Sequence, residues 1–582
     1  MDKDLEAAGA APTLRPPSTA LRGVSFPPPP PPPKDERYRP NTASTKRLSY
    51  STTVSTSQRT IKYATRGKFA GTELSPQPSD DPEDPLNWPQ WKKELNYVSL
   101  MVFVALVSGM KTVFISVNNV MARRYQVSYS AVVALTAVPL ILSAFTGLAS
   151  ITAAKVWGKR PVYLASMALV FIGSMWNMRT LDSYRECMAA RVFQGLGWGA
   201  FDTLILGSIY DTFFEHERGL RISIYNLITV AVTWGAPLFG GLASRNAGRF
   251  TLQFEIINSF LAVAVPLLIF GAAESTFDHV WSVSLQTPAS AISQFQRPLI
   301  PRGPLKITKE DVLSYLKTIP PASYKGNLET HTLLQAPRAF VAPTTILLFA
   351  VTLLPYGSLW AMAETVSLLF TTEPFALRED SISSLMGGPF MIMIILVSLV
   401  TYYKPYQAQF DKRKHFITLI AGTSLFMSGL LSFGLVTTPN LLSQASGFNY
   451  PLLAFLLALL AAGFSALDAT VSPLIFHSSQ FTSSNLYTCL RNVADMSAGV
   501  GCLRTLFTGI LVQAIPSAVE ASRGALARHA VALACTQVLL AGAAGTVWWI
   551  WGDRVRRWDG RVMGLVDLSM LRRNESFFEY DD

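Results

Sequence analysis

Two ionisable residues, Arg191 and Asp202, stand inside one long apolar stretch of the chain. Residues 188–210 are long enough to cross a bilayer as a helix, and an ionisable side chain at that depth is unfavourable unless it faces a partner or a water-filled cavity. On a helix the two residues are about 16 Å apart along the axis and rotated by only about 20°, so they face the same way. We interpret the pair as functional. The alternative is that Arg191 reaches toward a membrane surface and Asp202 caps a helix end.

Two further acids and three aromatic residues stand in apolar surroundings later in the chain. Asp468 lies deep in an apolar segment, so we expect an intramembrane carboxyl, whereas we expect Glu364 to lie at the outer rim. Arg191, Asp202, Asp468 and Glu364 are the candidates for proton coupling, with Arg191 facing a central cavity and modulating a proton on Asp202 or Asp468. The candidates for an aromatic pocket wall are Trp234, Tyr356 and Trp360. Membrane-surface belts explain many such residues, and for Trp360 we favour a belt.

The composition of the chain is that of an integral membrane protein. Of its 582 residues, 50% are hydrophobic and only 15% are charged, against about 25% charged in an ordinary soluble domain. The net charge of +11 comes largely from tails and loops and does not indicate a nucleic-acid partner. Cys187, Cys489, Cys502 and Cys535 are far apart, so they suggest neither a metal cluster nor a disulfide framework. We expect no cofactor.

Twelve apolar segments position these residues, in two groups of six. We place them at 95–115, 131–151, 162–178, 188–210, 222–242, 256–273, 340–360, 384–403, 416–436, 451–472, 493–515 and 530–551. The expected parts are a disordered tail (1–92), a first six-helix bundle (93–273), a central loop (274–338), a second six-helix bundle (339–551) and a C-terminal tail (552–582). The predicted fold class is an all-α membrane protein.

The charges that flank the apolar segments predict the orientation. The short loops alone discriminate little, but Lys92 and Lys93 before the first segment, and Arg554, Arg556 and Arg557 after the last, place both ends in the cytosol. The first thirty residues contain no apolar core of a signal peptide, so insertion begins with the first span. A proline run at 27–33 is typical of a stiff spacer, with binding to an SH3 or WW domain as the alternative.

Short motifs in the first half resemble one transporter family. Gly158, Lys159 and Arg160, followed by Pro-Val, resemble the end of the loop signature of the major facilitator superfamily. Arg191, with Gln-Gly three and four positions later, resembles the signature of the fourth helix in that family. The loop signature usually has an acid three positions before its glycine, and here that position is Lys155. A role attributed to that acid is therefore not carried over.

A second pair of motifs is similar to those of fungal drug:proton antiporters. Residues 81–88 resemble a lead-in of the form D-P-x-[ND]-P-x-N-W before the first span. In the fifth segment, Gly235, Pro237, Gly240 and Gly241 resemble the signature G-P-x-x-G-G, with alanine in place of the first glycine. Proline removes a backbone donor and glycine removes bulk, so this helix either bends where the halves rock or carries a rigid kink.

The resemblance implies a proton-coupled secondary transporter that exports drugs, toxins or other small organic molecules by alternating access. It implies protons, a small organic substrate and the lipid bilayer as partners, a monomer, and the plasma membrane as the location, with the vacuolar membrane as the alternative. Lys159 and Arg160 then hold the inward face closed, or serve only as a topology signal. One alternative is a proton-coupled importer of a nutrient or polyamine. Another is a membrane receptor or sensor that transports nothing.

The absence of certain motifs from the sequence argues against two function classes. An ATP-driven pump needs a G-x-x-x-x-G-K-[ST] loop, which the sequence lacks, so we expect no nucleotide partner. A membrane hydrolase needs a nucleophile elbow or a histidine cluster, and the six histidines are far apart. We expect a protein that is not an enzyme.

Overall fold

The computed structural model describes residues 62–64, 71–79, 81, 83–180, 183–247, 251–277, 330–371, 377–403, 412–443, 449–483, 485–522 and 525–573. By their contacts, Met1–Thr60 and Ile61–Asp582 form separate units, and the first lies outside the described residues. Most of the expected tail (1–92), of the central loop (274–338) and of the C-terminal tail beyond 573 also lies outside them. All that follows concerns the second unit.

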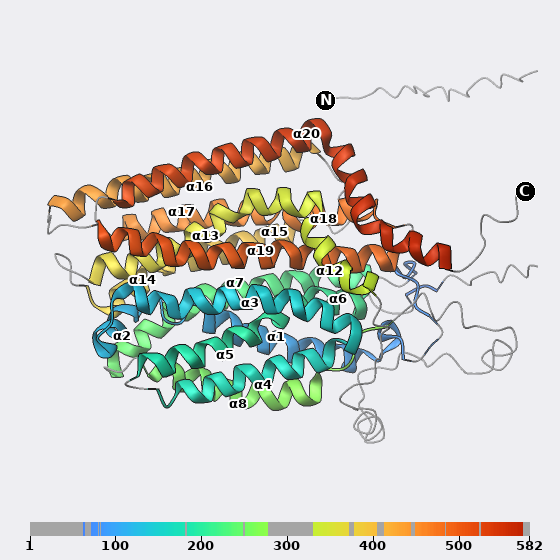
Figure 1. Ribbon diagram of the computed structural model, residues 1–582, viewed down its shortest axis with the longest axis horizontal. Helices are drawn as coiled ribbons and strands as arrows, with labels where there is room; N and C mark the ends of the chain where they lie inside the picture. The colour runs from blue at the N-terminus through green and yellow to red at the C-terminus, as the bar shows by residue number, and fades with distance from the viewer. Residues whose placement is uncertain are drawn as a thin grey trace, which may run out of the picture. The chain divides into compact units, whose positions relative to one another are not determined.

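The first half of this unit forms six spans (Figure 1). They are α1 (Gln90–Thr112), α3 (Tyr129–Trp157), α4 (Lys159–Asn177), α5 (Tyr184–Thr203) with α6 (Ile205–Thr212), α7 (Glu215–Ala247) and α8 (Leu252–Gly271). A short helix, α2 (Asn118–Tyr125), follows α1. Ser128 accepts a hydrogen bond from the Ala131 amide and so caps the start of α3, and Ser183 caps α5 in the same way. These caps fix where the second and fourth spans begin.

The second half repeats this arrangement. Its spans are α13 (Pro343–Thr371), α14 (Glu379–Leu385) with α15 (Gly387–Tyr403), α16 (Lys412–Ser443), α17 (Tyr450–Asp468) with α18 (Val471–Ser479), α19 (Leu486–Ala521) and α20 (Ala525–Arg573). A further helix, α12 (Thr330–Val341), precedes α13, and α20 is kinked at Trp551. Asn449 and Asn485 cap α17 and α19 through their side chains. All twelve expected segments are helical.

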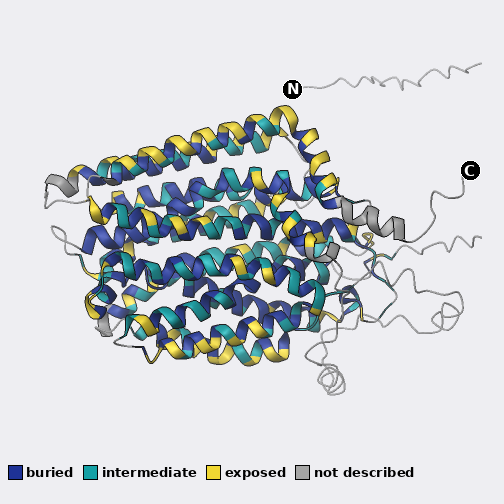
Figure 2. Cartoon of the chain, in the orientation of Figure 1, coloured by how far each residue is buried: buried dark blue, intermediate teal, exposed yellow. Residues whose placement is uncertain are grey.

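The outer helices carry a surface suited to lipid. In the part of the chain that the structure describes, ten helical segments are long and apolar enough by themselves to cross a membrane, and α4 and the α5–α6 pair complete the twelve spans. Exposed residues, yellow in Figure 2, gather on the outside of α8, α16 and α20, and they include Phe260, Ile420 and Leu539. Large apolar patches of this kind are unfavourable in water. The predicted all-α membrane fold is confirmed.

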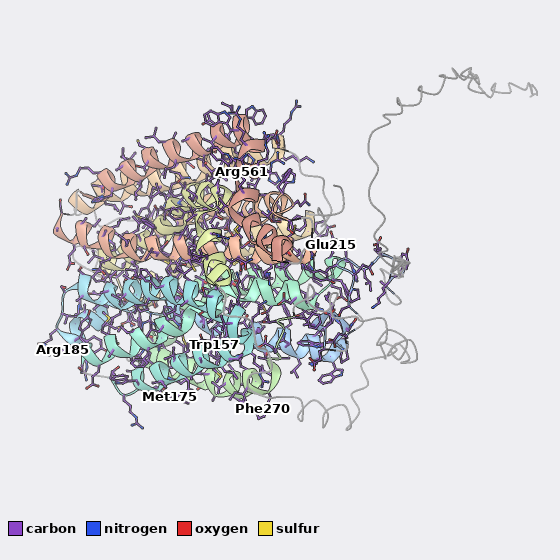
Figure 3. The ribbon with its side chains drawn as sticks, turned by 45° about the vertical axis from the view of Figure 1, so that its right-hand side comes forward. Trp157, Met175, Arg185, Glu215, Phe270 and Arg561 are labelled. Carbon is purple, nitrogen blue, oxygen red and sulfur yellow. The ribbon has the colours of Figure 1, made fainter. Side chains whose placement is uncertain are left out.

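The two halves meet along a few helices. α3 packs against α19, and α7 packs against α14 and α15. We call the end at which α1 begins and α6, α12 and α18 lie the tail side, and the opposite end, with α2 and α14, the far side (Figure 1). Figure 3 shows Arg185, near the start of α5, and Glu215, at the start of α7, at opposite ends, so the α5–α6 pair crosses from one side to the other.

The seventh span is longer than the sequence predicts. The expected segment ends at residue 360, but α13 continues to Thr371, because the residues after Trp360 are mostly apolar and all of them are buried. Glu364 therefore lies within the span. Its expected position at the outer rim is wrong.

The segment before α1 is packed, in contrast to the expected disorder up to residue 92. Leu74 and Leu86 are buried in one cluster with Phe214 from the α6–α7 connection. The Tyr487 hydroxyl, at the start of α19, donates a hydrogen bond to the backbone oxygen of Gln77. Leu74 and Leu86 thus supply enough apolar surface for packing, which the polar composition of the tail does not indicate. The described part of this segment contacts both halves.

Candidate functional site

Asp202 lies at an interruption of the fourth span. α5 ends at Thr203 and α6 begins at Ile205, so the aspartate is on the last turn of α5. Its carboxylate is 2.5 Å from the ammonium of Lys111, which is near the end of α1. The side chain forms an ion pair and does not cap α6, so the helix-cap alternative is wrong.

Asp468 has the same setting in the second half. It is the last residue of α17, and α18 begins at Val471 after a short interruption. Its carboxylate is 2.5 Å from the guanidinium of Arg504 on α19. Each half therefore holds one aspartate at a break in a span, paired with a basic residue from another span of the same half.

Two tyrosines lie near both aspartates. Tyr225 on α7 and Tyr356 on α13 are each within electrostatic range of Asp202 and of Asp468. The Arg504 guanidinium lies 5.3 Å from the centre of the Tyr356 ring. The two ion pairs consequently share one neighbourhood between the halves. We call it the central site, made of Lys111, Asp202, Tyr225, Tyr356, Asp468 and Arg504.

The three aromatic candidates meet beside the central site. The ring centres of Tyr356 and Trp360 are 5.9 Å apart, and those of Trp234 and Trp360 are 6.2 Å apart. Trp234 comes from the first half, so the cluster joins the two halves. Trp234 and Trp360 are both buried. The expected membrane-surface belt is therefore wrong for Trp360.

Arg191 is enclosed within the first half. Its guanidinium donates hydrogen bonds to the backbone oxygen of Leu135 at 2.9 Å, to that of Met110 at 3.0 Å and to the Gln194 side chain at 2.7 Å. It also lies 4.5 Å from the centre of the Phe114 ring. The residue is buried between α1, α3 and α5. It neither faces a central cavity nor reaches a membrane surface, so both expectations are corrected.

Trp198 connects Arg191 to the central site. The centre of its ring system lies 4.9 Å from the Arg191 guanidinium and 5.9 Å from the Lys111 ammonium. A cation is attracted to an aromatic face at these distances. Arg191 and Asp202, too far apart on one helix for direct contact, are thus linked through Trp198 and a residue of α1.

Glu364 joins the halves on the far side. It is fully buried, and Asn118 of α2 donates a hydrogen bond to its carboxyl. The Tyr129 hydroxyl, at the start of α3, donates to the backbone oxygen of Glu364 at 2.7 Å. Arg191 lies within electrostatic range of this carboxyl, but the two form no ion pair among the described residues. Its contacts are those of an interface.

The loop motif between α3 and α4 is held by acids of the first half. Gly158 has a φ of +90°, which an L side chain rarely adopts, and this turn brings Lys159 and Arg160 to the start of α4. The Lys159 ammonium is 2.5 Å from the Asp211 carboxylate. The amides of Lys159 and Arg160 each donate to Glu274 at 3.0 Å. These contacts lie within one half, so they do not close the passage between the halves directly.

Lys155 supplies an ion pair between the halves on the tail side. Its ammonium, on α3, is 2.5 Å from the carboxylate of Asp495 on α19. In the sequence Lys155 departs from the family signature, but nothing there indicates its partner. The charge at this position is opposite to the usual one, and the helix across the interface carries the matching acid.

The fifth-span motif packs against the second half. α7 remains helical through Pro237. A Cβ atom at Gly241 would collide with the Ser383 hydroxyl of α14, and one at Gly235 would crowd the Phe390 ring of α15. Gly240 instead lies against Gln253 of α8. The glycines thus permit close approach between spans, as expected of small residues in membranes.

Three charged residues of these contacts were missed in the sequence. Lys111 is the one charged residue of segment 95–115, and Arg504 shares segment 493–515 with Asp495 alone, so a charge in an apolar run marks them as it marks Arg191. Asp495 lies near the start of the eleventh span. Their partners come from other spans, and only the packing of the helices brings them together.

The described residues contain no cluster of ligands for a metal ion.

Comparison with known proteins gives the family of this chain. Residues 98–501 match the family model described as Major Facilitator Superfamily. Over 212 residues the chain is 32% identical to an uncharacterized MFS-type transporter of Schizosaccharomyces pombe, covering 36% of each chain. It is 27% identical to the protein HOL1 of Saccharomyces cerevisiae over 36% of each chain. It is 25% identical to Polyamine transporter 3 of the same yeast, over 31% of this chain and 29% of that protein.

These alignments span about a third of the length of the curated relatives. The family model, by contrast, covers more than half of this chain and includes the central site apart from Arg504. Members of this family are transporters and not enzymes, as the sequence led us to expect. The chain belongs to the Major Facilitator Superfamily.

Proposed function

We propose that this membrane transporter couples the movement of a small organic molecule to that of protons, and that it works as an exporter. In this proposal it acts as a monomer in the plasma membrane, with the tail side in the cytosol. The proposal extends the family assignment to a direction, a coupling ion and a location.

The observation that carries the proposal is the pair of intramembrane aspartates. Asp202 and Asp468 lie in different halves, at breaks in their spans, and share Tyr225 and Tyr356 as neighbours. Ionisable residues inside a membrane protein are the usual carriers of proton relays. Substrate sites of such carriers lie near the midplane, where two similar halves meet and helices are discontinuous. In support, the central site holds ionisable residues from both halves and lies at breaks in two spans.

Alternating access supplies a way to link protons to substrate. When the Asp202 or Asp468 carboxyl takes up a proton, its attraction to Lys111 or Arg504 falls, and the pair loosens. Separation of α3 from α19 on the tail side then breaks the contact between Lys155 and Asp495 and opens the central site to that side. Closure there and opening on the far side release the substrate.

Of the four candidate residues, we assign the coupling proton to the two aspartates. They lie in the space shared by the halves, whereas Glu364 is enclosed in a far-side interface and Arg191 in the first half. Arg191 then acts indirectly, by holding α1 and α3 and, through Trp198, the position of Lys111.

The test is flux in vesicles that contain the purified protein, at several imposed pH gradients. A screen of labelled organic compounds first identifies one that accumulates only when a gradient is present. Asp202→Asn or Asp468→Asn should then abolish the dependence on the gradient while exchange of labelled for unlabelled compound continues. The control is Asp211→Asn, which removes a paired carboxylate outside the central site. Full gradient-driven transport by both variants would contradict the assignment.

A second candidate is import of a nutrient or polyamine by the same protein. The yeast relative named Polyamine transporter 3 supports a polyamine as substrate. The direction of the gradient that drives accumulation in the vesicles distinguishes import from export. If no compound moves, a receptor or sensor built on the same fold replaces both proposals.

A further inference from the structure

The two aspartates of the central site occupy equivalent positions in an internal repeat. The segment 197–205 reads G-W-G-A-F-D-T-L-I, and the segment 463–471 reads G-F-S-A-L-D-A-T-V. Glycine, an aromatic residue, alanine and aspartate recur in the same order. The interruption recurs too, because α6 and α18 both begin three residues after the aspartate, at Ile205 and Val471.

The packing of the two segments confirms this correspondence. A Cβ atom at Gly197 would collide with the backbone of Ser166 on α4, the third span of the first half. A Cβ atom at Gly463 would collide with the backbone of Phe426 on α16, the third span of the second half. Each glycine thus lets its span approach the equivalent neighbour. The two carboxylates are presented by the same local structure in the two halves, and both lie within electrostatic range of Tyr225 and Tyr356.

The basic partners do not follow the repeat. Lys111 lies on the first span and Arg504 on the eleventh, and these two spans are not equivalent in the two halves. A duplicated pair of acids has therefore been combined with two independently placed cations. The acids and the cations therefore have different roles. The two aspartates are part of the repeated structure, and the two basic residues are not.

The carboxylates are more accessible than their partners. The Asp202 and Asp468 side chains are 27% and 44% exposed, whereas the Lys111 and Arg504 side chains are 11% and 17% exposed. One carboxylate oxygen of Asp202 is buried and has no hydrogen-bond partner among the described residues. The groups here that are able to bind a ligand are therefore the carboxylate oxygens and the rings of Tyr225 and Tyr356. Both attract a cation.

We propose that Asp202 and Asp468 form two equivalent subsites for one organic dication, a molecule with two amino groups, and that Lys111 and Arg504 are tethered counter-ions that the ligand displaces. An unpaired carboxylate inside the membrane is strongly unfavourable, so the empty carrier needs a cation of its own in order to change conformation. The ligand's two ammonium groups replace these cations at both subsites. The inference deepens the proposed function by naming the class of substrate.

Binding of simple amines to the purified full-length protein tests this inference. The probes are α,ω-diaminoalkanes from four to twelve carbons, and each is matched by the n-alkylamine of the same length. We expect at least one diamine to bind about tenfold more tightly than its monoamine, since it makes a second charge-assisted hydrogen bond. Asp202→Asn and Asp468→Asn should each reduce the affinity for that diamine to the monoamine level. Asp211→Asn, the control outside the central site, should leave it unchanged.

The counter-ion variants give the sharper measurement. Arg504→Gln and Lys111→Gln should each tighten diamine binding by several-fold, because they remove the competing cation, whereas a purely structural partner of the aspartate would weaken binding when removed. Weaker binding in both variants overturns the counter-ion role. Equal affinity of wild-type protein for diamines and monoamines overturns the dication, and this comparison needs no variant to fold. Tight binding of α,ω-dicarboxylates, lost in the two glutamine variants, would also overturn it.

These results separate the inference from the proposed function. Gradient-driven flux of another compound, without diamine binding, would contradict the dication subsites and still support proton coupling. Diamine binding without any gradient-driven flux would contradict proton coupling and still support the dication subsites.

Discussion

On the tail side the contacts between the halves include an ion pair, Lys155 with Asp495, beside the packing of α6 against α19 and of α12 against α3, whereas the far-side contacts are hydrogen bonds and close packing. The far-side contacts include Asn118 with Glu364 and Ser130 with Ser517. Opening an ion pair to water hydrates both charges and so offsets most of the attraction that is lost. Separating packed surfaces has no such compensation. Loss of the ion pair between Lys155 and Asp495 should therefore change the free energy less than separation of α7 from α14 and α15.

Overpacking the far side should have the largest effect. Gly241→Leu places a side chain where the Ser383 hydroxyl of α14 lies, so α7 and α14 cannot close. We expect flux to fall by tenfold or more, at equal protein amount, in the vesicle assay. Gly542→Leu on α20 is the matched control, because nothing lies within 4 Å of a Cβ atom there. Equal losses in the two variants would reduce the fifth-span motif to general packing.

Reversing one charge on the tail side should have the next largest effect. Lys155→Asp brings two carboxylates together, so α3 and α19 should separate and expose the buried Cys502 between them. With the other three cysteines replaced by serine, alkylation of Cys502 should become roughly tenfold faster. The double exchange Lys155→Asp with Asp495→Lys should restore the slow rate. Unchanged alkylation in the single variant would show that the ion pair does not hold this side closed.

Removing the far-side carboxyl without removing its bulk should have a moderate effect. Glu364→Gln keeps an oxygen that accepts from Asn118, so the interface stays formed. We expect flux to fall by no more than about threefold and to keep its dependence on the pH gradient. The measurement is flux at three imposed gradients, alongside Asp202→Asn. Loss of gradient dependence in the glutamine variant would move the coupling proton from the central site to the far side.

Truncation before α1 should have the smallest effect, and it depends on where the cut is made. Deletion of Met1–Thr60 should leave flux within about twofold of the full chain, because this unit is separate from the rest. Deletion through residue 79 removes Leu74 from its cluster with Phe214 and Gln77 from Tyr487, so it should reduce flux further. Identical flux from the two truncations would show that this tail-side contact is dispensable.

The sequence predicts the spans well because each needs only a long apolar run. It also singles out Asp202 and Asp468, since an acid in such a run is unusual wherever the helix packs. The sequence does not predict the position of Glu364, because that position depends on where α13 ends. The mostly apolar residues after Trp360 do not show where the helix stops. The sequence fails for Arg191 in another way: periodicity gives the side of the helix, but the three hydrogen-bond acceptors come from neighbouring helices and from the next turn.

The contact between Lys155 and Asp495 also bears on the ancestry of this chain. The major facilitator signature usually has an acid where Lys155 stands, so one lineage must have passed from one sign of charge to the other. Either change alone would set two like charges against each other, or leave one buried without a partner. The two positions should therefore have changed nearly together. In an alignment of relatives, an acid at the first position should occur with a basic or neutral residue at the second, and the two should covary.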